Sequence, residues 1–206
     1  MHPRFFRRLT ITGAGLLAAV LLSSCGRNNP GAAAGQPPTP SPLSPSATFN
    51  KADVSFASQM IVHHRQAIDM AQLAEQRASN TEVKQLAEQI KAAQEPEIDT
   101  MSTWLQQWGQ PVPSPSMNHG GHGNQGGQDG PGMMSDQEMS ELEAASGIDF
   151  DRMFLQMMIR HHQGAVEMAN AEQQHGENQP AQQLAAKIAS DQTAEINEMQ
   201  DLLTKI

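Results

Sequence analysis

One short sequence occurs twice in this chain, and the repetition limits what the chain can fold into. Residues 60–71 read MIVHHRQAIDMA and residues 158–169 read MIRHHQGAVEMA, which align at a constant offset of 98 residues. The same offset aligns residues 94–101 with residues 192–199. A similarity that holds at one offset over this length predicts two copies of one structural unit.

Each copy has the pattern of two helices joined by a short turn. Apolar residues recur at helical spacing, tyrosine is absent, and no segment alternates in the manner of a strand. We expect helices over residues 50–78, 81–108, 149–175 and 179–206, and a short one opened by a capping box at Ser135. One hairpin cannot bury its apolar stripe, so the two are expected to pack as an all-α four-helix bundle.

The N-terminal part has the composition of an export signal followed by a tether. Residues 1–25 join an arginine-containing start to a short apolar run, which predicts a lipoprotein signal peptide rather than a membrane span. The run ends in Leu-Ser-Ser-Cys, so Cys25 is the expected lipidation site, and an ordinary signal peptide is the alternative. Residues 26–48, rich in Pro, Ser and Gly, predict a disordered tether. The protein is therefore expected to be exported, by the Sec or Tat route, and lipid-anchored at the cell envelope.

The remaining residues, 49–206, are predicted to form one domain. Repeat one covers residues 49–110 and repeat two covers residues 148–206. The linker between them, residues 111–147, begins with a stretch rich in Gly, His and Met. This stretch is either a solvated loop or a flexible arm that captures metal. The candidate residues of the arm are Met117, His119 and His122.

Composition excludes several classes of function. Cys25 is the only cysteine, so the mature domain has no disulfide and no thiolate, and any metal must be bound by His, Met, Asp or Glu. The formal net charge of −9 argues against nucleic acid and anionic membrane surfaces as partners, which leaves the lipid as the only membrane contact. No nucleophile elbow, phosphate loop or Cys–His pair is present, so we do not expect an enzyme. The sequence leaves a homo-oligomer open.

The paired histidines fall on the predicted core face of the first helix of each hairpin, at about 100° of rotation per residue. Gln66 is expected to point away from this face. On each second helix a glutamine and a glutamate fall on the apolar stripe, where an unpartnered polar side chain is costly. The opposing histidines are the available partners. The expected polar layer contains the histidines His63, His64, His161 and His162, the glutamates Glu97 and Glu195, the glutamines Gln94 and Gln192, and the aspartates Asp53 and Asp151.

This polar layer has two interpretations. It is either a hydrogen-bonded network that fixes helix register, with no metal bound, or a metal site. In the metal site, imidazoles and glutamates are the ligands, and the glutamines and aspartates support them. Imidazoles with thioethers and no thiolate favour Cu(I), with Ag(I) as a mimic. The nearest methionines, which also suit a core-filling role, are Met60, Met101, Met158 and Met199.

A ferritin-like di-metal oxidase is a third interpretation. Its carboxylate site needs a Glu-x-x-His motif on two helices. Glu172 and His175 provide one such motif. The residues at the matching positions of the first repeat are Ala74 and Arg77. The motif is therefore unpaired, which argues against di-iron chemistry.

The doubled motif resembles the bacterial domain of unknown function 305 family. The pattern Asp-x-x-Phe-x-x-x-Met-Ile-x-His-His-x-x-Ala-hydrophobic-x-Met-Ala occupies residues 53–71 and 151–169, and Gln-x-x-Glu-Ile-x-x-Met occupies residues 94–101 and 192–199. The resemblance covers residues 49–206. It implies a ferritin-like four-helix fold and export, and it associates the chain with copper binding and resistance. We therefore expect a copper-binding lipoprotein that sequesters metal or hands it on, and a non-metal interaction module of the envelope is the alternative.

Overall fold

The structure is a computed structural model that describes residues 48–114 and 130–206. The helices in these ranges are α1 (Lys51–Arg77), α2 (Thr81–Gln107), α3 (Asp136–Ala144), α4 (Gly147–His175) and α5 (Gln179–Leu203). No strand occurs within the same ranges. The predicted signal peptide, the lipidation site and the capture arm lie outside the described residues, the latter two with Cys25, Met117, His119 and His122.

The helix ends follow the capping signals of the sequence. The side chain of Asn80 accepts hydrogen bonds from the backbone N–H groups of Glu82, at 2.7 Å, and Val83, at 3.3 Å, which starts α2. Ser135 and Glu138 form the capping box that starts α3. The all-α prediction is confirmed, and the predicted helices match the observed ones to within a few residues.

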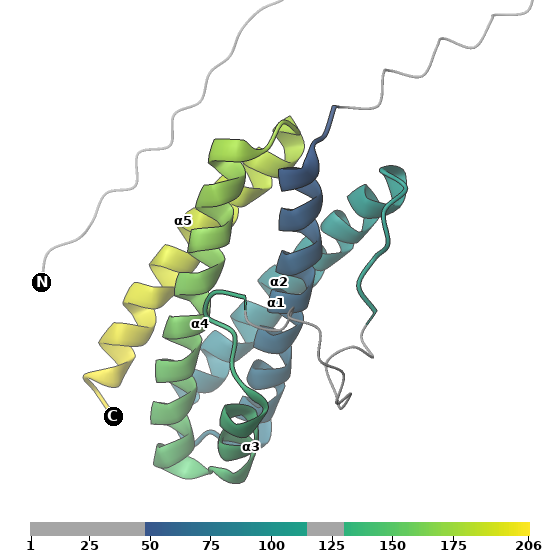
Figure 1. The fold of residues 1–206 in the computed structure, drawn as a ribbon. Coiled ribbons are helices and arrows are strands. Elements are labelled where there is room, and N and C mark those ends of the chain that lie inside the picture. Colours follow the sequence, from purple (N-terminus) through teal and green to yellow (C-terminus); the bar gives the residue numbers. More distant parts are fainter. Residues whose placement is uncertain (1–47, 115–129) are drawn as a thin grey trace, which may run out of the picture. The chain divides into compact units, whose positions relative to one another are not determined.

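The two hairpins pack through their first helices. α1 packs against α2 and against α4, and α4 packs against α5, whereas α2 and α5 touch each other little. Figure 1 shows this arrangement, with the short helix α3 beside the lower parts of α1 and α4. α1 and α4 are therefore the central pair, and side chains that face between them lie where the two repeats meet. Within the described ranges, no helix is both long and apolar enough to cross a membrane.

The apolar core is divided into two clusters along the bundle. One cluster contains Phe154 with the second half of α1, and the other contains Phe56 with the end of α2. Along α1, Ile61 belongs to one cluster and Ala67 to the other. The paired histidines lie between these two positions, so a polar layer separates two apolar ones.

Asp53 and Asp151 bind the loop of the opposite hairpin. Asp151 accepts hydrogen bonds from the backbone N–H groups of Ser79, at 3.1 Å, and Asn80, at 2.9 Å, and from the Ser79 hydroxyl group. Asp53 accepts from the N–H groups of residues 177 and 178, at 3.2 and 2.9 Å. Each aspartate precedes its histidine pair by ten residues, or roughly 15 Å of helix. This corrects the expectation that the aspartates support the histidines.

Glu172 on α4 places a second carboxyl group beside Asp53. It is buried against Gly176, where an added Cβ would lie 2.3 Å from Glu172 Oε1. Burial and the neighbouring Asp53 carboxylate raise the pKa of Glu172 to about 8. Burial also acts to raise the pKa of Asp53, but the backbone of Asn50, the Glu172 carboxyl and the backbone of residues 177–178 together lower it. Near neutral pH, Asp53 therefore carries the charge and Glu172 holds the proton.

We expect Glu172→Gln to remove part of the pH dependence of stability. The pKa of Glu172 is higher in the folded state than the usual 4.5, so the wild type loses free energy of unfolding as the pH rises through about 8. Glutamine needs no proton, so the variant is expected to exceed the wild type by about 2 kcal/mol above that pH. Denaturant titrations between about pH 5 and pH 9 measure the difference. Glu177→Gln, in the same loop but exposed, is the matched control, and identical pH profiles for wild type and Glu172→Gln would contradict the assignment.

Candidate metal centre

The four paired histidines meet between α1 and α4. The rings of His63 and His161 lie against each other, with centroids 3.7 Å apart and planes inclined by 38°. The His161 and His162 rings have centroids 6.4 Å apart. All four side chains are buried, with an exposed fraction of at most 1%. The structure therefore brings both copies of the histidine pair into one place, here called the histidine layer (His63, His64, His161 and His162).

Glutamates of the second helices bind the second histidine of each pair. His64 Nε2 lies 2.9 Å from Glu97 Oε2, and His162 Nε2 lies 2.7 Å from Glu195 Oε2. Lys187 on α5 adds a contact of 3.1 Å to Glu97 Oε1. The two His–Glu pairs follow the internal repeat. Lys187 departs from it, because its counterpart in the first repeat is a glutamine.

Burial favours the neutral form of the histidines. It lowers the pKa of His63 to about 3, and the neighbouring His64 adds to this effect. It lowers the pKa of His161 well below the usual value, and it lowers the pKa of His64 although Glu97 opposes the change. Burial acts to raise the pKa of Glu97, but His64 and Lys187 hold it below the usual value. At neutral pH the layer therefore offers imidazole lone pairs next to a glutamate carboxylate.

Hydrogen bonds decide which ring nitrogen carries the hydrogen. The Pro131 carbonyl oxygen, 3.1 Å from His63 Nε2, can only accept, and so can the carboxylates that bind His64 and His162. Nε2 therefore donates in these three rings, which leaves the lone pair on Nδ1. Among the described residues, Nδ1 has no hydrogen-bond partner in any of the four rings, and His161 lacks one on Nε2 as well. Such unpaired buried atoms are costly, and a metal ion is a partner that satisfies them.

Amides and thioethers surround the histidine layer. Gln94 and Gln192 are buried on the second helices, and neither amide atom of Gln94 has a partner within the part of the chain that the structure describes. Four fully buried methionines belong to the flanking apolar clusters, two in each cluster. They are one helical turn from a histidine or glutamate of the layer. These methionines are Met60 and Met101 in one cluster, and Met158 and Met199 in the other.

The histidine layer is not a preformed cage of hard ligands. Within residues 48–114 and 130–206, no three His, Cys, Asp or Glu side chains converge in a way that would hold a metal ion. The unpaired donors are imidazole nitrogens, and thioethers lie nearby, a set that suits Cu(I) better than iron. Glu97 and Glu195, predicted as ligands, instead bind histidine Nε2 atoms, which is how carboxylates support metal-binding imidazoles.

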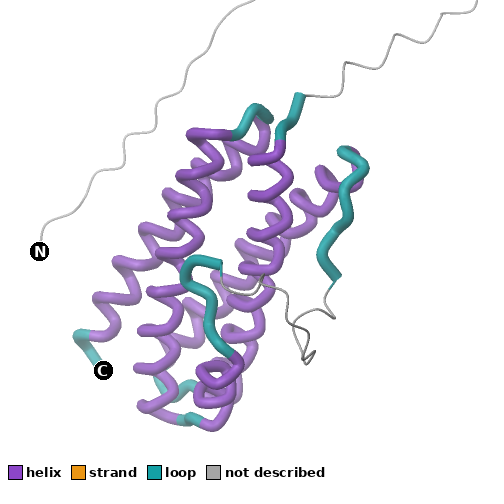
Figure 2. The backbone as a smooth tube through the Cα atoms, viewed as in Figure 1, coloured by secondary structure: helices purple, strands orange, loops and turns teal. Residues whose placement is uncertain are grey.

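The sequence interpretation missed a loop that covers the histidine layer. This loop, residues 130–134, is here called the strap, and Figure 2 shows it running along the helices toward α3. Gln66 was expected to point away from the core, but it is buried, and its amide binds both the N–H and the C=O of Met134, at 2.7 and 2.8 Å. Its counterpart in the second repeat is Gly164. This break in the repeat was the signal available in the sequence.

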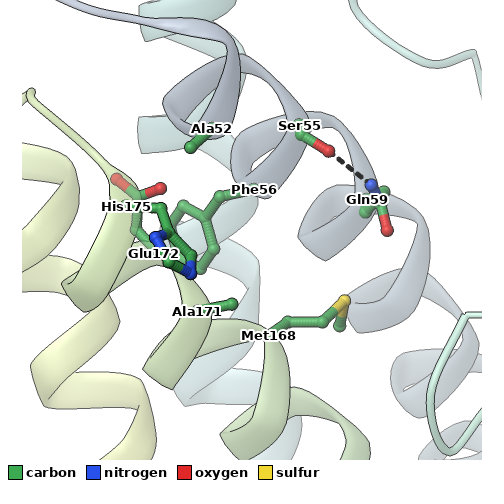
Figure 3. A pocket seen from close by; sticks show the side chains of 8 residues that line it. All are labelled: Ala52, Ser55, Phe56, Gln59, Met168, Ala171, Glu172 and His175. Carbon is green, nitrogen blue, oxygen red and sulfur yellow. Dashed lines mark hydrogen bonds between the residues drawn. The ribbon is translucent and has the colours of Figure 1, made fainter.

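A separate pocket of about 150 Å³ lies between α1 and α4 nearer the start of α1. The paired histidines do not line it. Figure 3 shows Glu172 and His175 at its wall, the two residues of the Glu-x-x-His motif. Glu172 is buried beside Asp53, whereas His175 is exposed. This geometry does not favour a di-iron site.

Comparison with known proteins connects this arrangement to a family. A family model described as "Domain of unknown function (DUF305)" matches residues 53–203. A DUF305 protein from Streptomyces coelicolor is 33% identical, with 75% of this chain and 93% of that chain covered and a TM-score of 0.66. A DUF305 fragment from Deinococcus radiodurans is 31% identical, with 79% and 100% covered and a TM-score of 0.65.

A third similar structure is that of CopM in its Cu(II)-bound form. It is 38% identical, with 74% of this chain and 96% of that chain covered and a TM-score of 0.62. Comparison with curated proteins gives no match. The residues matched by the family model include both copies of the paired-histidine sequence and both His–Glu pairs. The chain belongs to the DUF305 family.

Proposed function

We propose that this protein binds copper, preferentially as Cu(I), and acts in metal sequestration or homeostasis at the cell envelope without catalysing a reaction. One observation carries the proposal: four buried Nδ1 atoms have no hydrogen-bond partner among the described residues. A network that served only stability would pair these atoms, because each unpaired buried polar atom costs about 1–3 kcal/mol. A bound metal ion gives all four imidazoles a partner.

Each group of side chains has a distinct part in the proposed site. The histidine layer supplies the ligands through Nδ1, and the buried methionines Met60, Met101, Met158 and Met199 supply thioether sulfur. Glu97 and Glu195 orient the imidazoles that they bind. CopM, a similar structure, has been solved with Cu(I), Cu(II) and Ag bound, which supports copper as the metal.

The proposed location follows from the start of the chain. The apolar run and Cys25 would send the protein across the membrane and attach it to a lipid. The relative from Streptomyces coelicolor is described as a candidate secreted protein, which supports export. A disulfide-free domain with imidazole and thioether donors suits an oxidising envelope, because such donors do not form disulfides.

Metal titration of the mature chain tests the proposal. Elemental analysis and competition with a chromogenic chelator are expected to show Cu(I) bound in a defined ratio, and more tightly than Zn(II). A variant with all four histidines of the layer changed to alanine is expected to lose this binding, because no imidazole lone pair remains in the core. His175→Ala changes an exposed histidine outside the layer and is expected to bind normally. Undiminished binding by the fourfold variant would overturn the proposal.

A further inference from the structure

The strap lies across the histidine layer where α1 and α4 meet. The Pro131 carbonyl oxygen accepts a hydrogen bond from His63 Nε2 at 3.1 Å. Gly132 packs against the backbone of α4, where an added Cβ would lie 2.6 Å from Arg160 O and 2.9 Å from His161 O. Gly132 also has a φ of +77°, which favours glycine. The strap therefore contacts the helices of both stacked histidines, His63 and His161.

Two positions related by the internal repeat hold the strap in place. On α1, Gln66 binds the N–H and C=O of Met134. On α4, Gly164 lets the strap approach so closely that an added Cβ would lie 1.8 Å from the Pro131 oxygen. These positions differ between the repeats, as glutamine and glycine, although the neighbouring His-His pairs are the same. The repeat is thus broken at the two points where the strap attaches.

The strap is held more weakly than the helices around it. Its attachment to α1 consists of the His63–Pro131 hydrogen bond and two hydrogen bonds to Gln66. Displacing a helix would instead break the apolar clusters on both sides of the layer. Segments with few buried apolar contacts open at the lowest free energy. Lifting the strap is therefore a low-cost way to uncover the histidines.

We propose that the strap holds His63 as an Nδ1 donor and closes the α1–α4 side of the layer, so that it controls how fast copper enters and leaves. The proposal rests on the proposed copper-binding function. The seated strap occupies Nε2 of His63 and directs the remaining lone pair, on Nδ1, into the core. A lifted strap frees the His63 ring and opens the layer to solvent.

Copper release measures the closing role. Mature protein loaded with Cu(I) is mixed with an excess of a chromogenic Cu(I) chelator, and the transfer rate is followed by stopped flow. Gly164→Ala forces the strap off α4, so release is expected to be about tenfold faster, with Gln66→Ala between this variant and wild type. Gln163→Ala, on α4 but exposed, is the matched control. Wild-type rates in both strap variants would overturn the proposal.

A metal-free measurement tests the positioning role separately. In ¹⁵N-labelled apo protein, the ring nitrogen shifts of His63 are expected to report a hydrogen on Nε2, and Gly164→Ala is expected to shift them toward a mixture of tautomers. A wild-type hydrogen on Nδ1 would overturn the proposal even if copper binds. Failure of the wild type to bind copper would instead remove the proposed function, while the tautomer of His63 would still be decided.

Discussion

Asp151→Ala is expected to lower the free energy of unfolding by about 4 kcal/mol and to leave copper binding intact. The Asp151 carboxylate is fully buried and accepts hydrogen bonds from the backbone of Ser79 and Asn80 and from the Ser79 hydroxyl group. Alanine leaves these donors without an acceptor in the loop between α1 and α2. Because Asp151 belongs to the other hairpin, the change also loosens the contact between the two repeats.

Denaturant unfolding of the mature chain, with copper titrated separately, measures both parts of this prediction. Asp149→Ala is a suitable control, because Asp149 is exposed in the same turn of α4, and it is expected to change stability by less than about 0.5 kcal/mol. A variant Asp151→Ala that keeps wild-type stability but loses copper would return the aspartate to the metal site, against its placement in the fold.

The position of Asp151 shows what helical periodicity can and cannot predict. The wheel placed Asp53 and Asp151 correctly on the core face of their helices. It carries no information on which element the opposite hairpin brings to that height of the bundle. The partners of both aspartates are loop N–H groups more than 70 residues away in sequence. Docking of the hairpins alone creates these contacts.

The His–Glu pairs could be predicted because two local rules agreed. Glu97 lies on a stripe that must be buried, and a buried carboxylate needs a partner. The histidines were the polar side chains on the facing helices, and the constant offset required the same pairing in both repeats. The observed pairs, His64 with Glu97 and His162 with Glu195, follow this pattern.

The strap could not be predicted in the same way. It has no periodicity, and its contacts depend on backbone groups that any sequence possesses. Gln66 lies at the edge of the apolar stripe, where a glutamine usually faces solvent, and it became buried only because a loop covers it. The comparison of Gln66 with Gly164 was a usable clue. Interpreting it required the loop to be in place.

His161→Leu is expected to change stability in opposite directions with and without copper. Within the described residues, neither ring nitrogen of His161 has a hydrogen-bond partner, so leucine removes a desolvation cost and raises the stability of the metal-free protein by about 1–3 kcal/mol. The wild type in Cu(I) at 100-fold over its Kd is expected to gain about 2.7 kcal/mol. The leucine variant is expected to lose most of this gain with its ligand.

His162→Leu is the informative comparison, because His162 is equally buried but binds Glu195. Its replacement leaves a partly buried carboxylate without its partner, so the metal-free variant is expected to be less stable than the wild type. Thermal unfolding with and without Cu(I) separates the two explanations of the layer. A structural network predicts that both variants lose stability and that copper changes neither the wild type nor the variants. A metal site predicts a stabilised apo His161→Leu and a copper response confined to chains that keep their imidazoles, since the cost of the unpaired nitrogens is then offset only when the metal is bound.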